Sequence, residues 1–311
     1  MLLDGGLGQE LIHRMDADVA YPLWSLQVML DEPQLVADVH RDFCLAGANA
    51  VCLNTYCVTH SRLARDPIGI ELAPALEMAR TLAANGIRAS GRTNICTLAS
   101  LPPLVASFRS ELVLSVEQMA YEYKELIELQ SQHVDGFIAE TLSCIDEGRA
   151  VINAARAAGL HASRLMISFT VDDADGTRLR SGEPLTEALK LAEAHKAAAI
   201  LVNCSRPEAV TDSLKVLATG SIVFGAYANG FTSVDALMPG RTVDVLHARK
   251  DLTPASYAEY ARQWLQSGAG VIGGCCEVGP AHIAAVRDMI LTEGRTLHPV
   301  IPADSSIRMS T

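Results

Sequence analysis

Ala199-Ile200-Leu201-Val202-Asn203-Cys204 is an apolar run that ends in an amide and a thiol. A second run, Gly270-Val271-Ile272-Gly273-Gly274-Cys275-Cys276, has the same character and ends in two adjacent cysteines. Runs that are apolar on both faces are typical of parallel strands covered by helices. If both runs are parallel strands of one barrel, the three sulfurs meet at the same end of it.

Six further apolar runs complete a set of eight predicted strands. The eight are 1–4, 49–54, 94–98, 135–140, 165–170, 199–204, 221–227 and 270–275. Helical spacing and helix-start signals lie between them, such as Glu32-Pro33, Pro207-Glu208 and Thr253-Pro254. Strand and helix therefore alternate, which predicts a single (β/α)8 TIM barrel, with a doubly wound open sheet as the alternative.

The predicted strands end mostly in polar residues, and a barrel gathers such residues at the rim where its active site lies. These residues are Asp4, Asn54, Thr97, Glu140, Thr170, Cys204, Tyr227 with Asn229, and Cys275 with Cys276. The charged stretch 172–183 follows the fifth strand and is expected to form a loop that could cover the mouth.

Composition excludes several classes of function. The formal net charge of −11 comes without a basic cluster, so a nucleic-acid partner is not expected. No apolar stretch reaches the roughly 18 to 20 residues that cross a bilayer, and residues 1–6 lack a signal-peptide pattern, so we expect a cytoplasmic protein. In such a chain the eight cysteines favour free thiols and metal ligands over disulfides.

Three thiolates at one point would form a soft, anionic site that suits Zn²⁺ and leaves one tetrahedral position open. The alternatives are ordinary buried cysteines, or a strained disulfide between Cys275 and Cys276. Neighbouring side chains point to opposite sides of a regular strand, so both cysteines reach one metal only where the backbone turns. Gly273-Gly274 and Gly279-Pro280 are the expected sources of that turn.

Two acids stand at predicted strand ends. Asp4 before Gly5-Gly6 is either a turn residue or a ligand-binding acid, with Gly5 allowing a ligand close to the backbone. Glu140 is either a helix-capping or salt-bridged acid, or a carboxylate that binds a substrate ammonium group. Three more residues are either hydrogen-bonding partners of a substrate or partners of loop backbone groups: Asn54, Tyr56 and Asn203.

Ordered blocks over roughly residues 1–292 carry a resemblance to a known family. The blocks are Asp4-Gly5-Gly6-Leu7-Gly8-Gln9-Glu10-Leu11, Gly47-Ala48-Asn49 with Asn54-Thr55-Tyr56, Glu140-Thr141, Val202-Asn203-Cys204-Ser205, Tyr227-Ala228-Asn229, and Gly273-Gly274-Cys275-Cys276 with Pro280-Ala281-His282-Ile283. Together they resemble the homocysteine S-methyltransferase family. This zinc-dependent domain is shared by S-methylmethionine-dependent, betaine-dependent and cobalamin-dependent enzymes.

The resemblance implies a TIM barrel over residues 1–292 that binds homocysteine, with residues 293–311 as a C-terminal tail. It implies that Cys204, Cys275 and Cys276 hold Zn²⁺, and that Asp4 and Glu140 hold the amino group of homocysteine. Coordination to Zn²⁺ would remove the thiol proton and leave a nucleophile that attacks a methyl group in line. The substrates would be small molecules, and the product would be methionine.

The methyl donor is less well determined, because the chain departs from the family pattern near the expected mouth. Gln9 replaces a threonine, Ala228 a proline, and Glu277-Val278-Gly279 a threonine-rich triplet. The acidic chain favours a cationic donor. By the resemblance, S-methylmethionine or a related sulfonium is the first expectation, and a betaine-type donor comes second because betaine-dependent enzymes usually have a longer chain with an oligomerisation arm. Other readings are a homocysteine-binding and zinc-binding module that works with a corrinoid partner, and a thiol-redox protein. A cation–π wall for the donor is expected from Trp24, Tyr56, Phe169, Tyr227 and Phe231.

Overall fold

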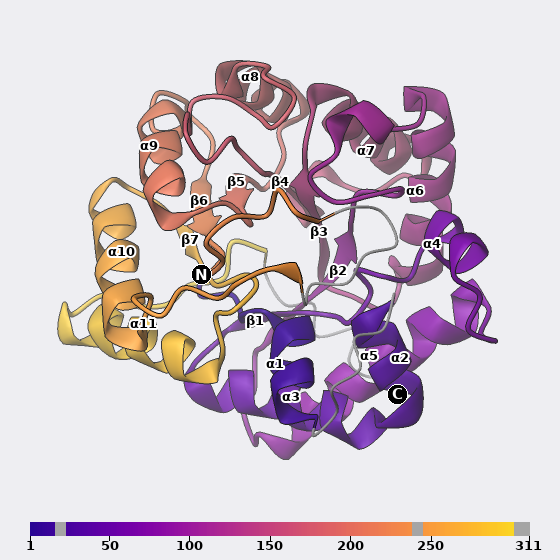
Figure 1. The fold of residues 1–311 in the computed structure, drawn as a ribbon, viewed down its shortest axis with the longest axis horizontal. Helices are drawn as coiled ribbons and strands as arrows, with labels where there is room; N and C mark the ends of the chain where they lie inside the picture. Colours follow the sequence, from indigo (N-terminus) through magenta and orange to yellow (C-terminus); the bar gives the residue numbers. More distant parts are fainter. Residues whose placement is uncertain (16–22, 238–244, 302–311) are drawn as a thin grey trace.

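The computed structural model describes residues 1–15, 23–237 and 245–301, and within them seven parallel strands form one sheet in sequence order. The sheet is curled, and helices surround it (Figure 1). The strands are β1 Ala50–Cys52, β2 Cys96–Leu101, β3 Gly136–Leu142, β4 Leu165–Phe169, β5 Ala199–Asn203, β6 Phe224–Tyr227 and β7 Val271–Ile272. The α-helices are α1 Leu7–Arg14, α2 Trp24–Asp31, α3 Pro33–Ala46, α4 His60–Arg65, α5 Leu72–Ala89, α6 Val116–Gln130, α7 Ile145–Ala157, α8 Leu185–His195, α9 Pro207–Leu217, α10 Pro254–Gln266 and α11 Pro280–Thr292, with short 3₁₀ helices at Ser110–Leu112 and Ala162–Arg164.

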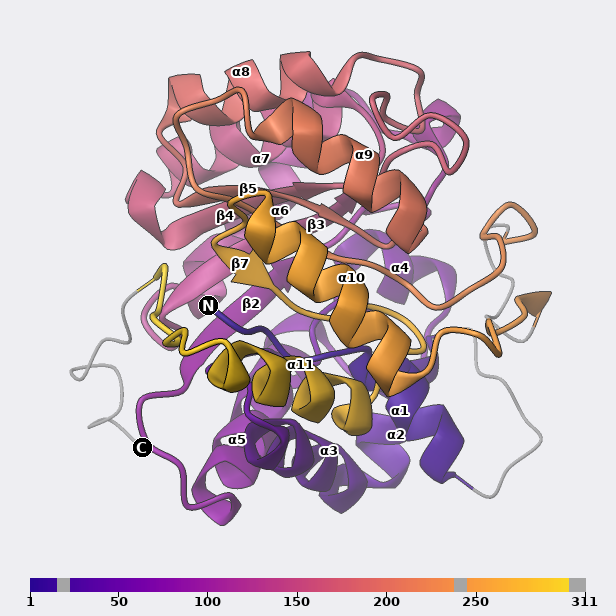
Figure 2. The same ribbon diagram turned by 90° about the vertical axis from the view of Figure 1, so that its left-hand side faces the viewer.

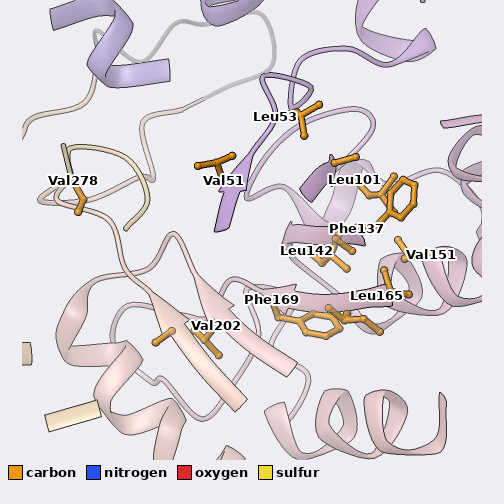
Figure 3. Close-up of a cluster of buried hydrophobic side chains, with 14 of the residues drawn as sticks. Val51, Leu53, Leu101, Phe137, Leu142, Val151, Leu165, Phe169, Val202 and Val278 are labelled. Atoms are coloured by element: carbon orange, nitrogen blue, oxygen red, sulfur yellow. The ribbon is translucent and has the colours of Figure 1, made fainter. Parts of the chain in front are cut away.

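Alternation along the strands separates two cores. Side chains on the outer face of the sheet, such as Phe137, Ile167 and Val202, pack against the helices in the larger cluster. Figure 3 shows members of this layer, among them Phe137, Val151 and Phe169. Inward-facing residues form a second, smaller cluster that includes Ile138 and Met166. Each large apolar side chain buried in this way contributes about 1.5 to 3 kcal/mol to folding.

The predicted first strand, residues 1–4, forms a single parallel bridge between Leu2 and Ile272 and is not a strand of the sheet. Its backbone nevertheless lies between β7 and β1. The Leu3 amide donates to the Ile272 carbonyl at 2.8 Å, and the Asn49 amide donates to the Leu2 carbonyl at 2.9 Å. Residues 1–4 pair over so short a length because Gly5 and Gly6 follow them and the chain turns into α1 at Leu7.

The helix-start signals are confirmed. Proline stands at the first turn of α3, α9 and α10, and the Thr253 side chain caps α10 by accepting from the Ser256 amide. Gly47 ends α3 with a left-handed φ of 119°, as a C-cap glycine does. Figure 2 shows α10 and α11 side by side over the β7 edge.

The third predicted strand, residues 94–98, was placed too early relative to β2. It was expected to end at Leu98 with Thr97 near the rim, whereas β2 runs to Leu101. Thr97 instead bonds to Asp135 near the start of β3, where its hydroxyl donates to the carboxylate at 2.9 Å. The residue that β2 brings toward the rim is therefore Ser100.

The opposite end of the curled sheet is filled by apolar side chains. Ile301 is fully buried in the inner cluster, with Met1 in the same cluster and Val300 packed against it. A side-chain carbon added at Gly136 would lie 2.6 Å from the Ile301 side chain, so the two residues are in close contact. Among the described residues, no helix is long and apolar enough to cross a membrane.

Candidate functional site

A cavity with about 930 Å³ of empty space opens at the carboxyl ends of the strands. Its wall combines three sulfurs, two carboxylates and an apolar side. The polar part comes from Asp4, Glu140, Cys204, Cys275 and Cys276, which the sequence analysis placed together at one rim. Residues from widely separated parts of the chain therefore meet at this end of the sheet.

Cys204 follows β5 directly and has a left-handed φ of 50°, which turns its side chain away from the strand direction. Its amide donates to the Tyr227 carbonyl at 3.2 Å, so the turn is fixed to the end of β6. The Cys204 and Cys276 sulfurs are 3.9 Å apart, and all three cysteine sulfurs lie within 4.8 Å of one another. The structure thus brings together the three thiols that the sequence singled out.

The backbone turn that allows this lies between Gly273-Gly274 and Gly279-Pro280, the two expected sources of it. It spans residues 275–278, where the Val278 amide donates to the Cys275 carbonyl at 3.1 Å and Glu277 has a φ of 64°. The glycines have a packing role instead: a side-chain carbon at Gly274 would lie 2.2 Å from Val278. Both cysteines face one point because the chain turns immediately after Cys275.

The three sulfurs influence one another's ionisation. Hydrogen bonds from Cys275 and Cys276 hold the pKa of Cys204 well below its usual range. The same hydrogen bonds to Cys204 hold the pKa of Cys276 well above it. One thiolate stabilised by two neighbouring thiols is therefore the favoured state of this cluster when no cation balances further charge.

The spacing of the sulfurs suits a tetrahedral metal. Zinc–sulfur bonds of about 2.3 Å place two sulfurs of a tetrahedron about 3.8 Å apart, close to the 3.9 Å between Cys204 and Cys276. Three soft donors without a fourth protein ligand leave one position for a substrate atom. Among the described residues, this is the only group of three candidate ligands at metal-binding spacing.

Asp4 and Glu140 are both buried and both hold their protons more tightly than usual. Burial, with a smaller contribution from the nearby charge of Glu140, raises the pKa of Asp4 to about 8, although the Cys52 amide donates to its carboxylate at 2.9 Å and acts in the opposite direction. Burial also raises the pKa of Glu140 to about 7, with a further contribution from Cys275. Two buried acids near each other are the environment in which a bound cation would restore both charges.

Hydrogen bonds orient the Glu140 carboxylate. The Ser100 hydroxyl donates to one oxygen and the Tyr227 hydroxyl to the other, at 3.4 Å. Ser100 was missed from the sequence because the third predicted strand was expected to end at Leu98, whereas β2 runs to Leu101. Tyr227 was identified from its block but had been expected to contribute an aromatic face.

The other predicted binding residues differ in their surroundings. Gly5, Asn54 and Tyr56 line the cavity. The Asn54 amide also donates to the Ser25 carbonyl at 2.9 Å, and the Tyr56 hydroxyl lies 2.7 Å from that of Ser107. Asn203 is different: it is fully buried, does not line the cavity, and its amide group is hydrogen-bonded to Thr141 of β3.

An apolar cluster forms one side of the cavity mouth. Phe231, Val234 and Leu246 from the β6–α10 segment pack with Phe108 and Leu237, and Cys276 lies against them. We call this set the mouth cluster. Phe108, which the sequence analysis did not identify, has a φ of 66° and comes from the β2–α6 segment. No motif marks it.

The expected aromatic wall is only partly correct. Tyr227 and Phe231 line the cavity, but one face of the Tyr56 ring is covered by Arg62 at 5.1 Å. Phe169 points away from the cavity into the outer core, where it contacts Gly148 of α7. The side chain of Trp24 lies outside the described part of the chain.

The 172–183 stretch, all of which is described, contributes no residue to the cavity wall. It touches the wall from outside through Arg180, whose guanidinium lies 5.5 Å from the centre of the Phe108 ring. Arg180 is itself paired with Asp173 at 2.8 Å. The cover over this side of the cavity therefore comes from the mouth cluster, and the predicted loop supports it from behind.

Glu277, one of the departures from the family pattern, lies beside the cavity wall. Its carboxylate accepts a hydrogen bond from the Gln9 amide at 2.8 Å and lies 3.1 Å from His13. Gln9 lines the cavity, so two of the departures form one contact between α1 and the turn that carries Cys275 and Cys276.

A curled parallel sheet inside a ring of helices, with a thiol-lined cavity at the strand carboxyl ends, defines a TIM-barrel-like α/β protein. A family model described as homocysteine S-methyltransferase matches residues 1–290. The chain therefore belongs to the homocysteine S-methyltransferase family, which is a family of enzymes.

Several characterised proteins are similar over most of their length. A homocysteine S-methyltransferase of Escherichia coli (strain K12) is 28% identical over 92% of this chain and 94% of that protein. Homocysteine S-methyltransferase 1 of Zea mays is 26% identical over 96% and 95%. A selenocysteine Se-methyltransferase of Brassica oleracea var. italica is 26% identical over 94% and 89%.

The fold also matches a solved structure. The homocysteine methyltransferase MmuM from Escherichia coli, in its metallated form, superimposes with a TM-score of 0.75. The two chains are 24% identical, and the match covers 93% of this chain and 95% of the other. This likeness supports the TIM-barrel-like fold.

Proposed function

We propose that this chain is a zinc-dependent methyltransferase that moves a methyl group from a small cationic donor to the thiol of L-homocysteine. The observation that carries the proposal is the position of three cysteine sulfurs, within 4.8 Å of one another, in the same cavity as two buried acids. A thiol and an ammonium group on one small molecule match these two features. Family membership supports the reaction class.

Cys204, Cys275 and Cys276 are the proposed ligands of Zn²⁺. When bound, Zn²⁺ acts as a Lewis acid that favours the thiolate form of a coordinated thiol near neutral pH. Hydrogen bonds from the two neighbouring thiols lower the pKa of Cys204, which favours negative charge on that sulfur. The cluster is thus prepared to attract a divalent cation.

Asp4 and Glu140 are the proposed partners of the substrate ammonium group. A cation between them would reverse the effects of burial on both pKa values, because an opposite charge favours the ionised acid. Ser100 and Tyr227 orient Glu140 for this role through their hydrogen bonds. Gly5, Asn54 and Tyr56 line the same space and would contact the rest of the amino acid.

The mouth cluster is the proposed donor side of the cavity. Phe108 and Phe231 line it, and an aromatic face attracts a sulfonium or quaternary ammonium group by about 0.5 to 2 kcal/mol. An anionic sulfur would attack a methyl carbon of such a cation while the donor's bond to that carbon breaks, and the donor would leave with the electron pair as a neutral thioether or tertiary amine. Charge is cancelled in this transition state, which an apolar wall favours over separated charges. A sulfonium such as S-methylmethionine is the preferred donor, and a betaine-type donor is the alternative.

Residues 1–4 are the proposed eighth strand of a TIM barrel that spans residues 1–292. Support comes from their hydrogen bonds to both β7 and the start of β1. Residues 293–311 would then form a segment outside the repeating βα pattern.

A turnover assay with purified, zinc-loaded protein tests the proposal. L-Homocysteine is combined in turn with S-methylmethionine, S-adenosylmethionine, dimethylsulfoniopropionate and betaine, and methionine is measured. We expect turnover with at least one sulfonium. Binding of homocysteine without turnover on any donor would favour a module that works with a corrinoid partner, and the absence of both would refute the proposal.

A further inference from the structure

The end of β3 has an unusual backbone. Thr141 has a φ of 62°, in the left-handed region that β-branched residues avoid. The pairing of β3 with β4 shifts register between Ala139 and Leu142, so Glu140 and Thr141 form an irregularity in the ladder. Such bulges redirect side chains, and here both residues of the bulge line the cavity. The orientation of Glu140 therefore depends on a strained backbone.

Asn203 holds this backbone in place from across the sheet. Its Oδ1 accepts from the Thr141 amide at 2.8 Å, and its Nδ2 donates to the Thr141 hydroxyl at 2.9 Å. The Ser168 hydroxyl of β4, the intervening strand, donates to the same Oδ1 at 2.7 Å. Asn203 and Ser168 are fully buried, and Thr141 is 2% exposed. We call this arrangement the clamp: two hydrogen bonds join Asn203 to Thr141, and a third joins Asn203 to Ser168.

The clamp joins the two parts of the cavity that a substrate would touch. Thr141 follows Glu140 directly, and Asn203 precedes Cys204 directly, so each clamped residue is next to a cavity group. Cys204 also has a left-handed φ of 50°, and its position depends on where β5 ends. The hydrogen bonds of Asn203 thus set the separation between the Glu140 carboxylate and the sulfur cluster.

We propose that Asn203 and Thr141 form a molecular ruler that fixes the thiol-to-ammonium distance and so selects homocysteine over the shorter cysteine. This inference rests on the proposed function of the site. Asn203 is a positioning residue, because its amide is engaged with Thr141 and Ser168 and does not line the cavity. Cysteine has one methylene fewer between its thiol and its amino group, and one methylene commonly changes selectivity by roughly 10-fold to 200-fold.

Binding measurements on zinc-loaded protein test the ruler without a methyl donor. Isothermal titration gives the Kd of L-homocysteine and of L-cysteine, and their ratio is the readout. For the unaltered chain we expect a preference for homocysteine of at least about 10-fold. In Asn203→Ala we expect weaker homocysteine binding and a ratio that falls to within a few-fold of one, with zinc content still near one per chain.

A matched pair at the other end of the clamp covers the case in which Asn203→Ala does not fold. Thr141→Val keeps the shape but removes the hydroxyl that accepts from Asn203, whereas Thr141→Ser keeps the hydroxyl. We expect the ratio to fall in the valine variant and to stay closer to that of the unaltered chain in the serine variant. Ser213→Ala is the stability control, because it removes a buried hydroxyl that bonds within α9 and to Gly176, away from the cavity.

The outcomes separate the two proposals. If the unaltered, zinc-loaded chain binds neither amino acid, the proposed function fails and the ruler fails with it. If it prefers homocysteine and both Asn203→Ala and Thr141→Val keep that preference, the ruler alone is wrong. Equal loss of selectivity in Ser213→Ala would also overturn it, because general destabilisation would then explain the effect.

Discussion

The two ends of the interior of the curled sheet differ sharply in chemistry. At the carboxyl end the inward groups are Asp4, Glu140 and three thiols, and the backbone at Thr141, Cys204 and Glu277 is left-handed. At the amino end the interior is filled by Met1, Ile138, Met166 and Ile301 with apolar contacts. One end carries buried charge and strained backbone, which cost stability, and the other supplies apolar burial that offsets them. The comparison predicts that substitutions at the two ends affect different measurements.

The largest effect is expected at the sulfurs. Cys204→Ser should lower bound zinc from about one per chain to near zero and abolish methionine formation, because two remaining thiolates make a much weaker site. Elemental analysis and the turnover assay measure both. Cys144→Ser is the control, because this buried cysteine occupies the N-cap position of α7, a position that serine favours. Unchanged zinc in Cys204→Ser would remove that residue from the proposed ligand set.

At the amino end, Ile301→Ala should destabilise the protein by about 2 to 5 kcal/mol, because it leaves a cavity against Gly136 in a fully buried cluster. Denaturant unfolding measures this loss. We expect zinc content and the Kd of homocysteine to remain unchanged in the folded variant. A large change in either would mean that the two ends are coupled more tightly than their separate clusters indicate.

At the carboxyl end, Glu140→Ala should weaken homocysteine binding by roughly 10-fold to 100-fold, because a hydrogen bond to a charged group contributes about 1.5 to 3 kcal/mol. Zinc content should stay near one per chain, since Glu140 is not among the three grouped ligands. Titration with homocysteine and metal analysis of the same sample give both quantities. Loss of zinc in this variant would place the acid in the coordination shell.

A smaller effect is expected in how the free energy of unfolding of the metal-free protein depends on pH. The pKa of Asp4 is raised to about 8 by burial, so between its usual range and pH 8 the folded chain binds more protons than the unfolded chain. The contribution of Asp4 to the free energy of unfolding therefore falls as pH rises, by about 1 kcal/mol per pH unit. Asp4→Asn should flatten this slope between about pH 5 and 8. Ile301→Ala should keep it, and an unchanged slope in Asp4→Asn would contradict the burial argument.

The parallel sheet and the meeting of the sulfurs could be predicted because each depends on local pattern plus one rule of topology. Apolar runs identify strands, and parallel strands bring their carboxyl ends together. Exact strand ends could not be read in the same way. Ser100 interrupts an apolar run and looks like a loop residue, yet its hydroxyl is satisfied by Glu140 from the next strand.

Contacts between residues far apart in the sequence explain the other differences between the predictions and the structure. Asn203 was expected near the substrate, but its partner Thr141 lies 62 positions away, and no periodicity reveals such a pair. Phe108 carries no motif, and its place at the mouth depends on packing with the β6–α10 segment. The 172–183 stretch was rightly placed after the fifth predicted strand, but its charge pattern could not tell whether it lines a cavity or supports its wall.

The close approach of Gly5 to Val278 has a consequence for folding order. A side-chain carbon at Gly5 would lie 1.9 Å from the Val278 carbonyl, so the first loop and the turn after Cys276 must fit against each other without space for any side chain. These segments are far apart in sequence, and contacts of this separation form late because the intervening chain must first be ordered. During synthesis on the ribosome the thiol cluster can assemble only after nearly the whole sheet has emerged, so metal uptake should report completed folding and not guide its early steps.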